Sequence, residues 1–159
     1  SGLRRAASGT LANDVSVFET NIRVVGGLLS AYDLSGDKDL LDIAEQVASR
    51  LAPAFNTPTG IPRSFVNLGT GSSHALSWTG GKSILADFGT MHLEWATLSD
   101  RTGNQKWGEL TARVFRTIRS AQTTSRIPEG LYPVFMHPDS GQFSGDLISF
   151  GAMGDSFYE

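Results

Sequence analysis

The sequence of 159 residues contains no cysteine. Disulfide bonds and thiolate metal ligands are therefore excluded. Basic residues are scarce as well, because 13 Lys and Arg residues are outnumbered by 16 Asp and Glu residues, and the only adjacent basic pair is Arg4-Arg5. This balance gives no electrostatic support for a nucleic-acid partner or for binding to an anionic membrane surface.

Long hydrophobic runs are also missing. No window approaches the roughly 18 consecutive apolar residues that a membrane span needs. The first ten residues, SGLRRAASGT, lack the apolar core of a signal peptide. Membrane attachment is therefore expected only through a segment outside this chain. With 40% hydrophobic residues and a net charge of -3, the sequence is typical of a globular protein or part of one.

The apolar residues of the first half follow two different helical patterns. Residues 17–34 carry apolar side chains on nearly every side, which predicts an inner helix that is buried all round. Residues 38–51 place apolar side chains on one stripe and charged ones opposite, which predicts an outer, amphipathic helix. A turn at Gly36 separates the two helices. Residues 56–81 are rich in Gly, Pro and Ser and predict a long loop with a hairpin near Phe65.

The same scheme repeats further along the chain. We expect Ser83 to cap a second inner helix that ends near residue 98, followed by a turn at Gly103. In the outer helix that follows, Trp107, Leu110, Val114 and Ile118 share one face.

A second long loop and a third helix complete the pattern. Residues 127–145 form this loop, with a predicted strand pair around residues 131–136 and a turn at residues 138–141. A third inner helix is expected to begin near Ser149.

The glycine turns reveal the repeating unit. Gly36 and Gly103 lie 67 residues apart, so each unit consists of an inner helix, an outer helix and a long loop. Inner helices bury their surface against neighbouring units, which favours a ring or solenoid of helical hairpins. A ring of about six or seven units would need on the order of 400 to 470 residues. Because Glu159 falls inside the expected third inner helix, we expect this chain to be a fragment.

Three acidic residues stand in comparable places, since Glu19, Asp87 and Asp155 each lie within the first two turns of an expected inner helix. In a helical ring these helix ends meet at one axial pocket, where paired carboxylates can perform glycoside hydrolysis. The alternative is structural. Acids near helix N-termini are favoured by the helix dipole, and Ser16 with Glu19 also fits a capping box. The residue pattern alone leaves both explanations open.

Two further features of the first inner helix support a site there. Arg23 lies four residues after Glu19 among apolar positions, so we expect it to be buried and to need a partner. It either forms an ion pair with Glu19 or orients a carboxylate or a sugar hydroxyl. Gly26 and Gly27 are unfavourable in a helix interior, so a neighbouring helix is expected to pack closely against them. The three histidines, at positions 74, 92 and 137, have no metal-ligand spacing and predict packing or surface roles.

Several longer stretches carry a resemblance to a known family. VSVFETNIRVVGGLLSAYDLSGD, LAPAFNTPTGIP, VNLGTG, ILADFGTMHLEW and FGAMGDSFYE occur in this order. They resemble consecutive landmarks of glycoside hydrolase family 47, the class I α-1,2-mannosidases of N-glycan processing. The resemblance covers residues 12–159 and leaves residues 1–11 unplaced. It implies an all-α fold, an (α/α)7 barrel with β-hairpin loops. This chain would supply a partial arc of the barrel: about two helical hairpins and the start of a third.

The resemblance also implies an activity. Family 47 enzymes hydrolyse terminal α-1,2-linked mannose from high-mannose N-glycans with inversion and use a calcium ion. They work in the lumen of the secretory pathway, in the endoplasmic reticulum or Golgi, or are secreted. The family's base glutamate, its calcium-binding threonine and the aromatic residue under the terminal sugar belong to its C-terminal half. They are absent here, so no metal ligand is assigned in this chain and the chain alone is expected to be inactive.

The family motifs assign roles residue by residue. Glu19 in F-E-x-x-I-R and Asp155 in D-S-F/Y-Y-E correspond to the catalytic acids. The resemblance does not decide which of them delivers the proton, directly or through water. The substrate pocket would include Arg23, Asp87, Met153 and Glu159.

Two of these pocket positions carry further information. Asp87 stands where the family usually has glutamate, so it is one methylene shorter, and a bridging water could span the difference. Met153 occupies a place that is arginine in the endoplasmic-reticulum enzymes and smaller and apolar in the Golgi type. An apolar residue there predicts trimming of several mannoses rather than one.

A rival function comes from another class. A glycan-binding quality-control protein of the degradation-enhancing mannosidase-like type shares an F-E-x-x-I-R-like stretch and has little hydrolytic activity. The segments ADFGTMHLEW and LSGD resemble the processing enzymes more closely. Hydrolysis is therefore the favoured prediction, and glycan binding without turnover is the alternative.

Overall fold

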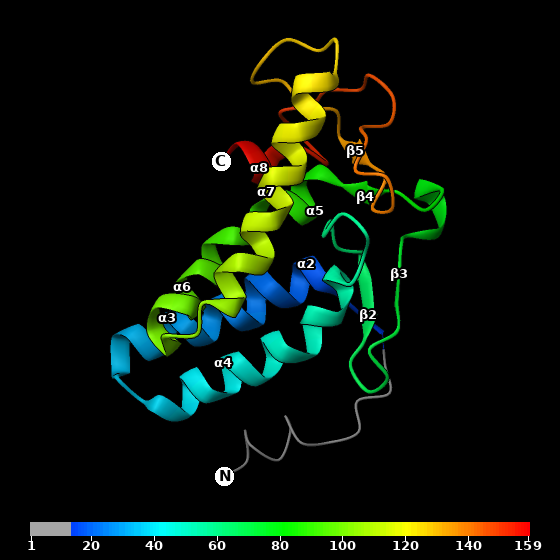
Figure 1. Ribbon diagram of the computed structural model, residues 1–159. Coiled ribbons are helices and arrows are strands. Elements are labelled where there is room, and N and C mark those ends of the chain that lie inside the picture. Colours follow the sequence, from blue (N-terminus) through cyan, green and yellow to red (C-terminus); the bar gives the residue numbers. More distant parts are fainter. Residues whose placement is uncertain (1–13) are drawn as a thin grey trace.

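The computed structural model of the protein describes residues 14–159; the N-terminal segment 1–11, which the motifs leave unplaced, lies outside these residues. Figure 1 shows two helical hairpins whose inner helices begin on the side of the short strands and end at glycine turns on the other side. The first hairpin consists of α2 (Val17–Thr20), η1 (Asn21–Val25), α3 (Gly26–Ser35) and α4 (Lys38–Leu51). The second consists of α5 (Leu85–Thr90), α6 (His92–Thr102) and α7 (Lys106–Thr124). The predicted succession of inner and outer helices is confirmed.

Local signals explain where the first hairpin starts and turns. The backbone N–H of Glu19 donates to Ser16 Oγ at 3.2 Å, so Ser16 caps α2, which is one half of the predicted capping box. Gly36 ends α3 in the left-handed conformation with φ 72°, which glycine adopts without a steric cost. Asp37 then accepts from the N–H of Asp39 and caps α4.

The first inner helix is not buried all round, which corrects the prediction from its composition. Its buried residues recur at every fourth position, and they are Val17, Asn21, Val25 and Leu29. Outward-facing apolar side chains remain, since Val24 is 41% exposed and Leu34 is 91% exposed. The physical reason is that this helix packs on α4 and α6, which cover only one of its faces. The middle of the helix, η1, is a π-helix, a feature that the sequence analysis missed.

The second inner helix begins differently from the prediction. Ser83 lies in strand β4 (Ser83–Ile84) and donates its hydroxyl to the Pro62 carbonyl at 2.7 Å, so it does not cap the helix. The helix starts at Leu85, is interrupted at Met91 and ends at Gly103, which has φ 73°. Gly103 therefore repeats the role of Gly36, as the spacing predicts.

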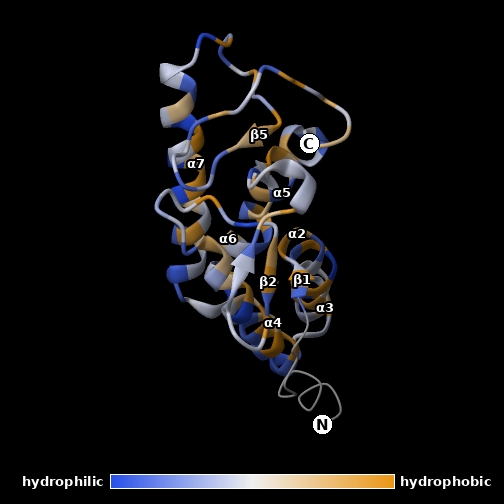
Figure 2. Ribbon diagram, turned by 90° about the vertical axis from the view of Figure 1, so that its right-hand side faces the viewer, coloured by the Kyte–Doolittle hydropathy of each residue, from blue (hydrophilic) through white to orange (hydrophobic). Residues whose placement is uncertain are grey.

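The core lies between the two hairpins. Trp95 of α6 is fully buried, with its ring 4.9 Å from Phe55 and 5.7 Å from Trp107. Trp107, Val114 and Ile118 of α7 are buried together, which confirms the predicted stripe on this helix. Hydrophilic and hydrophobic residues alternate along α7 in Figure 2, as expected for an outer helix with one face on the core.

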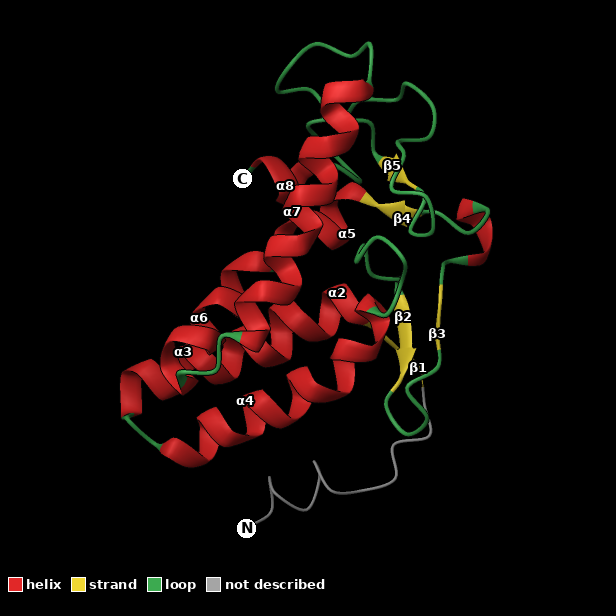
Figure 3. Ribbon diagram, viewed as in Figure 1, coloured by secondary structure: helices red, strands yellow, loops and turns green. Residues whose placement is uncertain are grey.

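The long loops carry two small antiparallel sheets (Figure 3). The strands β1 (Asp14–Ser16), β2 (Phe65–Asn67) and β3 (Ser73–His74) form the first sheet, which contains the predicted hairpin. The strand β5 (Phe135–Met136) pairs mainly with β4, although one bridge from Met136 to Phe143 closes the local turn. The predicted strand pair around residues 131–136 is therefore only partly present, because its main partner precedes α5.

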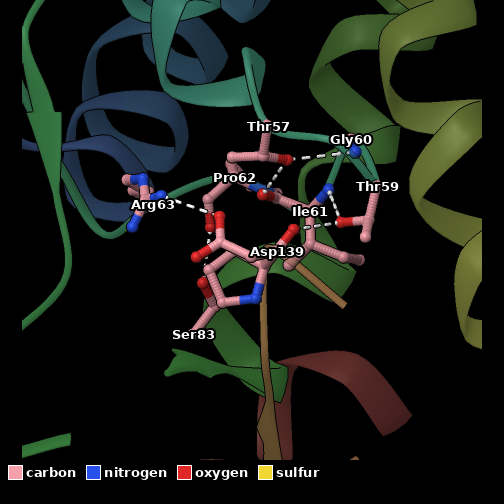
Figure 4. A network of polar contacts seen from close by, with 9 residues as sticks. Thr57, Thr59, Gly60, Ile61, Pro62, Arg63, Ser83 and Asp139 are labelled. Carbon is pink, nitrogen blue, oxygen red and sulfur yellow. Dashed lines mark hydrogen bonds and ion pairs between the residues drawn. The ribbon is translucent and has the colours of Figure 1, made fainter. Parts of the chain in front are cut away.

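A polar network ties the two long loops together (Figure 4). Thr59 Oγ1 donates to the Pro138 carbonyl at 2.5 Å, and Arg63 Nη2 donates to Asp139 Oδ1 at 2.9 Å. The same loops supply carbonyls to the inner helices, since the N–H of Val17 donates to Ser64 and the N–H of Leu85 to Val134. The network thus anchors the loops from which the helix N-termini emerge.

The third inner helix begins later than predicted. α8 (Asp155–Tyr158) starts six residues after Ser149, because Gly151 to Gly154 form turns before it. Glu159 is the C-terminal cap residue of α8. Within residues 14–159, no helix combines the length and the apolar character that crossing a membrane requires.

Candidate active site

Three helix N-termini bring the predicted acids together. Glu19 is the third residue of α2, Asp87 is the third residue of α5, and Asp155 is the first residue of α8. α5 packs against both α2 and α8, so Asp87 lies in the middle of the group. The convergence that the sequence pattern predicts for these three acids is present in the structure.

The carboxyl of Asp87 interacts electrostatically with the carboxylates of Glu19 and Asp155. Partial burial removes water from its carboxyl, and the negative charges of Glu19 and Asp155 oppose a further negative charge there. Burial first and these charges second raise the pKa of Asp87 to about 6. A carboxyl in this state holds a proton under mildly acidic conditions and can donate a hydrogen bond, which an ionised carboxylate cannot.

Glu19 has a different environment. Arg23 Nε donates to Glu19 Oε2, and the two side chains are 74% and 47% exposed, respectively. The prediction that Arg23 is buried is wrong, because Asn21 and Val25 take the face of η1 that is turned toward the core. The predicted ion pair is confirmed. The hydrogen bond and the negative charge of Glu19 raise the pKa of Arg23 above its usual range.

α5 contacts α8 and the turn before it through one backbone hydrogen bond and one close side-chain contact. The N–H of Ala86 donates to the Met153 carbonyl at 2.9 Å, which satisfies a donor that a helix start leaves free. One turn later Phe157 lies on Gly89, where an added Cβ would be 2.3 Å from the Phe157 ring atom Cδ2. These two contacts enclose Asp155 from both sides along the chain, so they determine where its carboxylate lies relative to Asp87.

The remaining predicted pocket residues also lie around α8. Met153 has φ 73° and is the one non-glycine residue with positive φ in residues 14–159. Asp155 Oδ1 accepts from the N–H of Ser156 at 3.0 Å. Glu159 is exposed one turn after Asp155, and its N–H donates to the Asp155 carbonyl at 3.1 Å. Substrate contacts by the side chains of Met153 and Glu159 stay predictions.

The described part of the chain contains no group of three or more His, Cys, Asp or Glu side chains that could hold a metal ion. His92 is a packing residue, since its Nδ1 lies 2.8 Å from Thr111 Oγ1 and its ring meets the ring of Phe115 edge-on. His74 stacks on Phe65. His92 therefore has the predicted packing role, and His74, whose side chain is 53% exposed, has the predicted surface role.

The sequence analysis missed one buried polar residue beside the site. Asn21 is 0% exposed and connects η1 to α6 through hydrogen bonds with Glu94 and Trp95. A related signal was Gly26, which predicted that a neighbouring helix packs closely against the first inner helix. This is confirmed, because a Cβ added at Gly26 would lie 3.4 Å from Glu94 Cγ of α6. The same prediction is wrong for Gly27, which has nothing within 4 Å.

A known protein family matches nearly the whole chain. The model of glycosyl hydrolase family 47 matches residues 5–159, and thus starts before residue 12, where the resemblance of the motifs begins. The chain belongs to glycosyl hydrolase family 47. The resemblance carried by its motifs is confirmed.

Two relatives within family 47 are named as mannosidases. The chain is 52% identical over 148 residues to the mannosyl-oligosaccharide 1,2-alpha-mannosidase MNS1 of Arabidopsis thaliana, with 92% of this chain and 26% of the relative covered. It is 44% identical over 148 residues to the mannosyl-oligosaccharide 1,2-alpha-mannosidase IB of Homo sapiens, with 92% and 22% covered. The chain therefore spans about a quarter of the length of these relatives.

A solved structure of the same family agrees with the fold. The alpha-1,2-mannosidase from Trichoderma reesei matches with a TM-score of 0.80 at 30% sequence identity, covering 98% of this chain and 35% of that chain. The helical hairpins and the loops between them are thus a family 47 arrangement.

Proposed function

We propose that the protein hydrolyses terminal α-1,2-linked mannose from high-mannose N-glycans with inversion of configuration. The observation that carries this proposal is the meeting of Glu19, Asp87 and Asp155 at three helix N-termini. The relatives are mannosyl-oligosaccharide 1,2-alpha-mannosidases, which supports the substrate class. The two hairpins and α8 are proposed to form an arc of an (α/α)7 barrel whose axial pocket contains these acids.

Inverting hydrolysis needs one group that protonates the leaving oxygen and another that activates water, about 6.5 to 9.5 Å apart. Glu19 and Asp155 are the proposed groups on the acid side, each acting directly or through a water molecule. Asp87 holds a proton up to about pH 6, so it can donate to a sugar hydroxyl or to a bridging water. Arg23 is proposed to orient Glu19 or a sugar hydroxyl, since it already contacts Glu19.

Calcium is proposed as the cofactor of the full-length protein, although residues 14–159 do not fit a calcium site. Calcium takes about 6 to 8 oxygen ligands, and the described residues offer no suitable cluster. The proposed calcium ligands therefore lie outside residues 14–159, and the family resemblance places the proposed catalytic base outside them as well. Exhaustive chelation should abolish activity of the full-length protein, and calcium should restore it. Full activity after chelation would contradict this assignment.

The proposed setting is the lumen of the secretory pathway or the medium outside the cell, where high-mannose N-glycans occur. Met153 is proposed to contribute an apolar wall to the pocket, which favours removal of several mannoses from one glycan. Stepwise glycan analysis of the full-length protein tests this point. Accumulation of a product that has lost a single mannose would contradict it.

The central experiment measures release of mannose from α-1,2-mannobiose by the full-length protein, with the anomer of the first product identified by proton NMR. Inversion predicts β-mannose as the first product. Retained anomeric configuration would contradict the inverting mechanism. Tight binding of a high-mannose glycan without turnover would instead support the alternative, a quality-control protein that binds glycans.

A further inference from the structure

We propose that Asn21 is a positioning residue of the active site, which sets the directions of Glu19 and Arg23 by locking η1 to the second inner helix. This inference rests on the proposed function, because it assigns Asn21 a role in the same site. Asn21 lies two residues after Glu19 and two before Arg23, but its own side chain points into the core and is 0% exposed.

The amide of Asn21 has one possible orientation. Its Nδ2 donates to Glu94 Oε2 at 2.8 Å, and its Oδ1 accepts from Trp95 Nε1 at 2.9 Å. An indole N–H can only donate, and an ionised carboxylate can only accept. Rotation of the amide by half a turn would therefore break both bonds. A buried polar group with both partners defined in this way holds its backbone in a single position.

Both partners are themselves fixed. Trp95 is fully buried between the rings of Phe55 and Trp107. Glu94 lies over Gly26, where an added Cβ would come 3.4 Å from Glu94 Cγ. The anchor for Asn21 is therefore a rigid part of α6, and η1 cannot turn without disturbing the core.

The π-helical turn has a geometric purpose in this arrangement. Buried residues recur at positions 17, 21, 25 and 29, whereas an α-helix completes a turn in about 3.6 residues. Residues spaced by four in an α-helix therefore drift gradually around the helix and leave the core-facing side. The π-helix η1 has a wider turn with i→i+5 hydrogen bonds, and this wider turn brings the buried residues back to the core-facing side. Asn21 is the first residue of this π-helix, so its bonds hold the position where the correction begins.

The consequence falls on the residues around it. If η1 relaxed to an α-helix, the residues on its two sides would shift by one position relative to each other. In an α-helix a shift of one residue is a rotation of about 100° around the helix axis. Glu19 would then turn away from Asp87, or Val25 and Leu29 would leave the core. Since misplacement of a catalytic group by about 1 Å can lower a rate roughly 100-fold, this lock matters for the reaction as well as for folding.

The test is a pair of substitutions in the full-length protein. Asn21→Asp places a carboxylate against that of Glu94 and should lower kcat/KM by about 100-fold at pH 7. Glu94→Gln alone keeps an acceptor for Asn21 Nδ2 and should have little effect. Combined, the two changes again pair a donor with an acceptor and should restore kcat/KM to within about tenfold of the wild type. The double variant has the same net charge as the wild type. Comparison of the two single variants with the double variant therefore separates the effect of the hydrogen-bond geometry from the effect of charge.

The chain offers a matched control. Glu45 Oε1 accepts from Asn104 Nδ2 at 3.1 Å and from Trp107 Nε1 at 2.9 Å, which is the same combination of residue types at the glycine-turn end of the hairpins. Asn104→Asp makes the same chemical change there and should leave kcat/KM unchanged. An equal loss of activity in Asn104→Asp would show that the effect is general destabilisation, which would overturn the proposal.

Additional readouts keep the outcomes separate. Asn21→Gln retains the amide but is one methylene longer, so it should fold, and its kcat/KM should fall at least about tenfold through displacement of η1. If it and a folded Asn21→Asp keep normal kcat/KM, Asn21 has only a structural role.

If the wild type is inactive, the proposed function fails, and the NMR signal of Arg23 Nε–H still tests the lock. That signal should shift in Asn21→Asp and return in the double variant, and an unchanged signal would overturn the inference.

Discussion

The two inner helices present acids at the same helical position but in opposite surroundings. Glu19 and Asp87 are each the third residue of their first helical segment. Glu19 is half-exposed and paired with Arg23, whereas Asp87 is largely enclosed and faces two carboxylates. An equivalent position in two repeat units therefore does not determine whether a carboxyl group is ionised and paired or protonated. The partners that the other segments bring to it decide whether a carboxyl is paired with a cation or keeps its proton.

The difference has a structural origin. The first inner helix turns Arg23 outward because Asn21 and Val25 occupy its inner face. The second starts directly from β4 and is covered by α8, which brings Asp155 to Asp87. One repeat thus provides an ion pair at the surface, and the other provides a proton-holding site next to it.

The largest expected effect comes from Glu19. Glu19→Gln keeps the side-chain length and leaves the backbone N–H that donates to Ser16 unchanged, but it cannot deliver a proton. In the full-length protein kcat should fall at least about 100-fold, while Tm should stay within about 4 °C. Asp155→Asn should behave similarly.

The control for Glu19→Gln is Glu109→Gln. Glu109 also pairs with an arginine, Arg116, and both side chains are exposed on α7. This variant should retain normal kcat. Normal kcat in Glu19→Gln together with lost stability would show that the Glu19 carboxylate has only a structural role, through its ion pair with Arg23.

The next effect tests how α8 is held. In Gly89→Ala the new methyl group would meet the Phe157 ring at 2.3 Å, so α8 and Asp155 must move. Overpacking of this kind typically costs about 1 to 3 kcal/mol of stability, and kcat should fall about tenfold or more. Gly27→Ala, where nothing lies within 4 Å, should instead stabilise the helix by about 0.5 to 1 kcal/mol. Equal behaviour of the two variants in thermal unfolding and kinetics would refute the contact.

Asp87 predicts a pH dependence of stability whose sign follows from its raised pKa. Its usual value is 3.8 and its folded value is about 6, so the folded state binds the proton more tightly. Its favourable contribution is complete below about pH 4 and is lost as the pH rises through about 6. Asp87→Asn should therefore raise the free energy of unfolding at pH 7 by on the order of 1 to 3 kcal/mol. At pH 4 it should change little, and urea unfolding at both pH values checks this. An equal gain at pH 4 and pH 7 would contradict the assignment.

The smallest expected effect concerns Arg23. Because its side chain is 74% exposed, Arg23→Gln should change Tm by less than about 2 °C. The matched variant Arg116→Gln should behave alike in Tm. A rise in KM in Arg23→Gln alone would sharpen the comparison, since it would show that this surface arginine contacts the sugar. Identical kinetics in both variants would leave Arg23 with the ion pair as its only role.

Features with a local cause could be predicted from the sequence. Gly36 and Gly103 end their helices in the left-handed conformation, and α4 covers the predicted residues 38–51. The three acids were identified because their repeat positions correspond. For the two turns and for α4, the signal and the structure that it determines lie within a few residues of each other, whereas the acids were found through the repeat of the helical units.

The failures share a non-local cause. Ser83 has the chemistry of a helix cap, but Pro62 offers it an acceptor and β5 pairs with its strand. Arg23 was expected to be buried because neighbouring residues are apolar, yet the inward face of η1 carries Asn21, whose partners are Glu94 and Trp95 of another helix. No pattern within residues 16–29 contains those partners.

Met153 combines a backbone contact with a proposed place in the pocket. Its left-handed backbone, with φ 73°, lets its carbonyl reach Ala86, and a side chain with a Cβ pays about 1 to 2 kcal/mol for that conformation. Its side chain is also the proposed wall of the sugar pocket. Any replacement other than glycine at this position must therefore adopt the same unfavourable backbone. A substitution that alters the proposed pocket wall thus also changes the stability of the turn that leads into α8.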